Sequence, residues 1–130
     1  MKKMTRLLFV LAPLTLLVSG VVSASDNDVH STSMFQGPKA NTGTAMHSVE
    51  AGKSILRVSK DFKVPDTPAP TWRVVDSKGV IYTLDAFKIK GGEKREVVVP
   101  AYVKDIAKVQ VYCAWAEVIL GEAPFSTAVK

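Results

Sequence analysis

The chain has 130 residues, of which 17 are Lys or Arg and 12 are Asp or Glu, and its formal net charge is +5. Three of the basic residues and none of the acidic ones lie in the first 24 positions, so the remainder carries 14 basic and 12 acidic residues. This small excess, without an evident basic patch, gives no indication of nucleic-acid binding. The single cysteine excludes a disulfide bond within the chain.

The N-terminus has the pattern of a secretory signal peptide. Basic residues are followed by an apolar run of 12 residues at 7–18, and small residues precede an expected cleavage after Ala24. The run is shorter than the roughly 20 residues that span a bilayer, with an uncleaved anchor as the alternative. We therefore expect residues 1–24 to be a signal peptide and the protein to be exported, periplasmic or extracellular, with no stable membrane anchor after cleavage.

The part of the chain after the expected cleavage site suits one small domain. Residues 25–34 are polar and without periodicity, so we expect a flexible lead-in before a domain at 35–130. His30 lies in this lead-in and is expected to be solvated and without a role.

Short stretches of alternating apolar and polar residues follow, separated by turns that contain glycine or proline. They predict strands at 43–49, 55–58, 72–75, 80–84, 87–90 and 94–99. A proline-rich loop is expected at 65–70, and one helical turn within 102–108. This spacing predicts an all-β fold, a small antiparallel β-sandwich or partly closed barrel of about 7–9 strands.

Residues 109–121 are the longest apolar run after the expected cleavage site, and they are predicted to be the central strand. Both faces of this strand would be apolar, which is typical of a strand covered on two sides, although a buried helix is the alternative. Glu117 falls on the same face as Cys113 and Trp115. We therefore expect a bulge near Ala116, or an exposed strand end.

Cys113 is the candidate for covalent or redox chemistry. Between Val111 and Trp115 it should be desolvated, so we expect burial to raise the pKa of the thiol and make it inert. His47 is the sole histidine of the predicted domain, and nothing in the spacing indicates that it meets Cys113. Because no catalytic set of residues emerges, the sequence favours a protein that is not an enzyme.

The sequence offers no complete metal site and no evident cofactor. A blue-copper centre needs two histidines beside its cysteine, and a structural zinc site needs four ligands. No histidine or methionine follows Cys113. Copper or haem held by Cys113 and His47 stays open as an alternative.

The two tryptophans, Trp72 and Trp115, are expected in the core. If Trp72 were instead exposed beside the proline-rich loop, its indole ring would be a platform for a ligand.

Several motifs in order resemble the DM-thirteen domain, a small secreted module described as an electron-transfer domain, over residues 35–125. The matching positions are Phe35, Gly43-Thr44-Ala45, Leu56-Arg57-Val58, Asp61-Phe62, Pro70, Trp72-Arg73-Val74-Val75, Pro100, Tyr112-Cys113, Val118, Leu120, Gly121 and Ala123. Two positions depart from the family pattern, because Ala116 lies where an aromatic residue is usual and Tyr112 replaces a tryptophan. The resemblance implies a β-sandwich-like domain with a redox-active signature cysteine.

On this basis we expect a redox or electron-transfer accessory protein of the cell envelope that uses Cys113. Its candidate neighbours are Tyr112, Trp115 and His47, and its partner would be an envelope protein or another redox protein. The alternative is a non-catalytic module that binds a protein or another ligand through Trp72 and the proline-rich loop, with Cys113 in a structural role.

Overall fold

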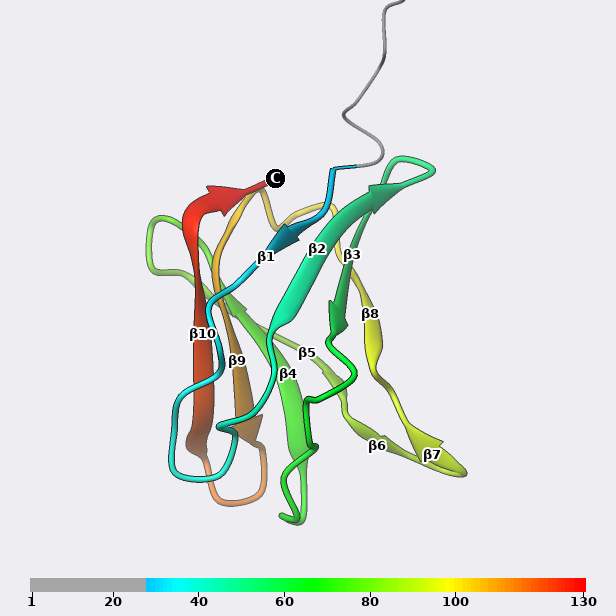
Figure 1. The fold of residues 1–130 in the computed structure, drawn as a ribbon, viewed down its shortest axis with the longest axis vertical. Helices are drawn as coiled ribbons and strands as arrows, with labels where there is room; N and C mark the ends of the chain where they lie inside the picture. The colour runs from blue at the N-terminus through cyan, green and yellow to red at the C-terminus, as the bar shows by residue number, and fades with distance from the viewer. Residues whose placement is uncertain (1–27) are drawn as a thin grey trace, which may run out of the picture.

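The computed structural model describes residues 28–130, and the predicted signal peptide at 1–24 lies outside them. Within the described range the chain forms ten strands and no helix, so this part has no helix that could span a membrane. The strand pairs are antiparallel, and two four-stranded sheets face each other as a sandwich (Figure 1). The predicted all-β fold is confirmed, with short additional strands.

The two sheets draw their strands from different parts of the chain. The first sheet has the order β1-β2-β3-β8, with β1 (His30–Ser31), β2 (Ala45–Glu50), β3 (Lys53–Val58) and β8 (Glu96–Val99). The second has the order β10-β9-β4-β5, with β10 (Val118–Val129), β9 (Ile106–Cys113), β4 (Pro70–Val75) and β5 (Ile81–Ala86). A small hairpin of β6 (Lys88–Ile89) and β7 (Gly92–Glu93) extends to one side (Figure 1).

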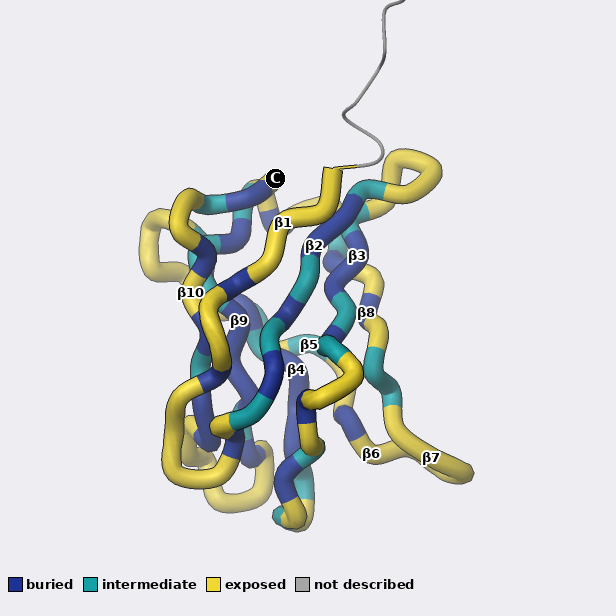
Figure 2. The backbone as a smooth tube through the Cα atoms, in the orientation of Figure 1, coloured by how far each residue is buried: buried dark blue, intermediate teal, exposed yellow. Residues whose placement is uncertain are grey.

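The core lies between the sheets, and the buried segments follow β4 and β9 (Figure 2). Because side chains alternate along a strand, cross-strand partners enter the core together. Trp72 is opposite Val111, Val74 is opposite Val109, and all four are fully buried. Burial of each large apolar side chain stabilises the fold by about 1.5–3 kcal/mol.

Two predicted hairpins are confirmed. The strands β2 and β3 pair along their whole length, from Ala45 opposite Val58 to Glu50 opposite Lys53. The strands β4 and β5 pair across a turn in which the N–H of Gly79 donates to the carbonyl oxygen of Asp76 at 3.0 Å. These turns have local signals, since glycine and aspartate occupy the positions that such turns favour.

The prediction of one central strand over residues 109–121 is wrong after Cys113. The strand β9 is central, but it ends at Cys113, and a turn at 114–117 leads into β10. Cys113 is paired with Val118, and Glu117 is an exposed turn residue with φ of 56°. No bulge near Ala116 is formed. The apolar run concealed the turn because the turn residues Ala114, Trp115 and Ala116 are themselves apolar.

The lead-in predicted to be flexible contributes to the first sheet. His30 and Ser31 pair with His47 and Met46 of β2, and Thr32 is buried. The N–H of Thr32 donates to the carbonyl oxygen of Ala45 at 2.9 Å. A polar sequence forms a strand here because the edge of β2 supplies the backbone partners.

Two further expectations are corrected between 87 and 108. The predicted hairpin of 87–90 with 94–99 is reduced to the short β6–β7 pair, because β8 joins β3 in the other sheet. There the alternate residues Val97 and Val99 are buried. No helical turn forms within 102–108, and β9 begins at Ile106 instead.

Candidate functional site

Three connecting segments meet around the end of β9 at one end of the sandwich. They are the chain between β1 and β2, the chain between β3 and β4, and the turn between β9 and β10, all at the lower end of Figure 1. They border a hollow of about 380 Å³ with an almost wholly apolar lining. The lining residues are Pro38, Lys39, Thr67, Pro68, Cys113, Trp115, Ala116, Val118, Ile119 and Leu120.

The thiol of Cys113 forms part of the wall of this hollow and is 1% exposed. The N–H of Ala116 donates a hydrogen bond to the Cys113 Sγ at 3.4 Å. This bond lowers the pKa of the thiol; burial acts in the opposite direction, and the N–H groups of Ala69 and Trp115 add to the lowering. Burial raises the pKa as expected, but the hydrogen bonds outweigh it and the pKa of Cys113 lies below its ordinary value, so the expectation of a net increase is wrong.

The turn at 114–117 and the loop before β4 place these donors around the sulfur. The N–H of Glu117 donates to the carbonyl oxygen of Cys113 at 2.8 Å and closes the turn. The N–H of Ala114 donates to the carbonyl oxygen of Ala69 at 3.0 Å and joins the turn to the loop before β4. Backbone groups, rather than a charged side chain, therefore stabilise the thiolate.

Trp115 is exposed, although the sequence analysis placed it in the core. It is 76% exposed and lines the hollow beside Cys113. Tyr112 precedes Cys113 and therefore points to the opposite face of β9, where its ring centroid lies 4.2 Å from the Arg73 Cζ. Of these two predicted neighbours, the structure brings only Trp115 to the hollow.

Trp72 is buried completely, with an exposure of 0%. Its indole N–H donates to the carbonyl oxygen of Lys94 at 2.8 Å, and its ring stacks on Phe87 with 4.4 Å between centroids. A side chain without exposed surface cannot contact a ligand. The prediction of a ligand platform at Trp72 is therefore wrong, whereas its prediction as a core residue is confirmed.

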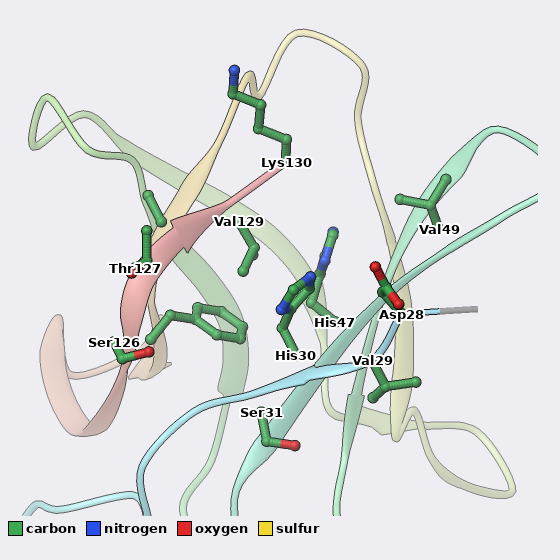
Figure 3. Close-up of a pocket in the computed structure, with 12 residues that line it drawn as sticks. Asp28, Val29, His30, Ser31, His47, Val49, Ser126, Thr127, Val129 and Lys130 are labelled. Carbon is green, nitrogen blue, oxygen red and sulfur yellow. The ribbon is translucent and has the colours of Figure 1, made fainter. Parts of the chain in front are cut away.

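His47 lies at the other end of the sandwich, far from Cys113. It lines a separate hollow of about 660 Å³ together with His30 and Phe125 (Figure 3). Its Nε2 lies 2.7 Å from the hydroxyl of Ser54, and its Nδ1 is buried without a hydrogen-bond partner. Sequence reasoning missed the contact with His30, because it exists only once β1 has joined β2.

The residues at 28–130 bring no three His, Cys, Asp or Glu side chains together as a metal site. Cys113 and His47 line different hollows at opposite ends of the sandwich. They therefore cannot bind one copper ion or one haem iron together, and the alternative that joined them is wrong.

No protein-family model, no curated protein and no solved structure matches this chain. The resemblance to the DM-thirteen domain stays a prediction from the residues that carry it.

Proposed function

We propose that this protein is an exported redox accessory protein, with a DM-thirteen-like domain, that reacts through the thiolate of Cys113. The observation that carries the proposal is the hydrogen bond from the Ala116 N–H to the Cys113 Sγ at the wall of an apolar hollow. The thiolate is the reactive form of cysteine, and N–H donors favour it. Export rests on the signal-peptide pattern of residues 1–24.

Because a single thiol cannot form a disulfide within the chain, the proposed chemistry is exchange with a sulfur that a partner supplies. The Cys113 thiolate attacks one sulfur of a disulfide in the partner, and a new S–S bond forms. The partner's own S–S bond breaks, and its second sulfur leaves as a thiolate with the electron pair of that bond. Attack by a partner thiolate on the mixed disulfide returns Cys113 to the thiolate. Trp115 at the rim supplies apolar contact area for the segment that carries the disulfide.

We expect native Cys113 to react with an aromatic disulfide reagent and to release aromatic thiolate in an amount equal to the protein. Because its pKa is lowered, the reaction rate should reach half of its plateau value at a pH below the ordinary thiol pKa of about 8.5. Stopped-flow absorbance measurements across a pH series test this.

The variant Cys113→Ser is the control and should release no aromatic thiolate. If wild-type Cys113 reacts only after denaturant has been added, or titrates at or above the ordinary thiol pKa, the redox proposal is wrong.

The exposure of Trp115 supports a second candidate, a non-catalytic module that binds an apolar peptide segment in the same hollow. The two candidates differ in what Cys113→Ser does. A binding module keeps its peptide binding in Cys113→Ser and loses it in Trp115→Ala, as a peptide array would show. A redox protein loses its mixed disulfide in Cys113→Ser, while Trp115→Ala only slows its formation.

A further inference from the structure

Two histidines face each other where the first strand joins the sheet. His30 of β1 is the cross-strand partner of His47 of β2, and their ring centroids are 6.3 Å apart with 28° between the ring planes. His47 is 1% exposed, and its ring lies nearly perpendicular to the Phe125 ring, with 6.4 Å between centroids. Figure 3 shows both imidazoles in the hollow beneath the end of β10. The contact between β1 and β2 therefore includes a pair of titratable rings.

This environment suits a neutral imidazole at His47 and not a charged one. The Nε2 is satisfied by the Ser54 hydroxyl, but the Nδ1 is buried with no acceptor. A protonated ring carries an N–H on both nitrogens, so the added proton would leave a buried donor unsatisfied. Burial, followed by repulsion from a charged His30, lowers the pKa of His47.

The other charges around His47 are few. Asp28 and Lys130 line the same hollow and have opposite signs, while β3 and β10 contribute the uncharged Ser54 and Phe125. The ion pair of Glu50 with Arg57 belongs to the opposite face of the sheet, because these residues alternate with His47 and its partner Leu56.

The strand β1 is also weakly attached. It has two residues and is the edge strand of its sheet. Beyond them, Thr32 is joined to Ala45 by two hydrogen bonds of 2.9 Å, one from the N–H of Thr32 and one to its hydroxyl. Such a segment opens locally without global unfolding.

We propose that His30 and His47 form an acid-sensitive latch, which holds β1 on β2 near neutral pH and releases β1 when both rings are protonated. Like charges opposite each other on paired strands are destabilising, and the buried ring lacks an acceptor for its second proton. Release exposes the edge of β2, whose free backbone groups can pair with another strand. The latch lies at the opposite end of the sandwich from Cys113 and does not depend on the redox proposal.

Hydrogen exchange of the Thr32 amide tests the latch. On going from about pH 7.5 to about pH 5.5, on either side of the ordinary histidine pKa of about 6.5, we expect the protection factor of this amide to fall by up to about tenfold. One histidine kept neutral in the closed state changes the opening equilibrium by no more than about tenfold per pH unit below that pKa. Protection factors already correct for the intrinsic effect of pH on exchange. Amides of the central strands β4 and β9 should keep their protection and serve as internal controls.

The variant His30→Gln removes one charge from an exposed position and should leave the fold intact. We expect the fall at Thr32 to be smaller than in the wild type, since burial of His47 remains but repulsion from His30 is lost, and the His47 ring, followed by NMR, to titrate at a higher pH. An unchanged Thr32 protection factor in the wild type, or the same fall in His30→Gln, overturns the latch.

Discussion

Replacement of Trp72 by alanine is expected to lower the free energy of unfolding by about 3–5 kcal/mol, the cost of removing a large aromatic side chain from a packed core. Trp72 is fully buried, stacks on Phe87 and lies opposite Val111. Its loss also leaves the carbonyl oxygen of Lys94 without its indole donor. Because small domains have a total stability of about 5–15 kcal/mol, Trp72→Ala removes a large share of it.

The chain contains a matched control for this experiment. Trp115 is the same residue type in a turn and is 76% exposed, so Trp115→Ala should change the free energy of unfolding by no more than about 0.5 kcal/mol. Urea denaturation of both variants, followed by circular dichroism, gives the comparison. Equal losses in the two variants would contradict the assignment of Trp72 to the core and of Trp115 to the surface.

Replacement of Gly121 by alanine is expected to destabilise the protein by about 1–3 kcal/mol or more, the cost of overpacking. An added Cβ would collide with the backbone carbonyl oxygen of Ala40 and lie 2.7 Å from the Ala40 Cβ. Backbone atoms cannot rotate away as the end of a side chain can, so the segment containing Ala40 must move. This segment is held by the Lys39 and Ala40 N–H groups, which both donate to the carbonyl oxygen of Leu120.

Movement of the segment that contains Ala40 has a second expected consequence. Pro38 and Lys39 form one wall of the hollow beside Cys113, so Gly121→Ala should also raise the rate at which Cys113 reacts with the disulfide reagent. Ser126→Ala, at an exposed position on the same strand, is the control. It should change neither the free energy of unfolding nor the rate at which Cys113 reacts. If Gly121→Ala unfolds at the same urea midpoint as the wild type, the close approach of Gly121 to Ala40 is not required for stability.

The positions of most strands and two hairpin turns could be predicted because their signals are local. Alternation of apolar residues marks the strands, and Asp76 with Gly79 marks a turn whichever sheet the strands later join. The hairpin at 114–117 was missed because Ala114, Trp115 and Ala116 carry no such local turn signal.

The candidate sites depended on contacts between distant parts of the chain. The exposure of Trp115 follows from the turn, and the complete burial of Trp72 follows from its pairing with β9 and its stacking on Phe87. The lowered pKa of Cys113 follows from the N–H groups that the folded turn and the loop before β4 direct at its sulfur.

Local patterns in the sequence were therefore sufficient for the fold class, because backbone geometry and side-chain alternation act between near neighbours. Tertiary structure alone decided which tryptophan faces solvent, that the pKa of the thiol is lowered, and that His30 meets His47. These properties depend on desolvation and on contacts made by the folded turn at 114–117, the loop before β4 and the pairing of β1 with β2, and the local pattern of apolar residues does not specify them.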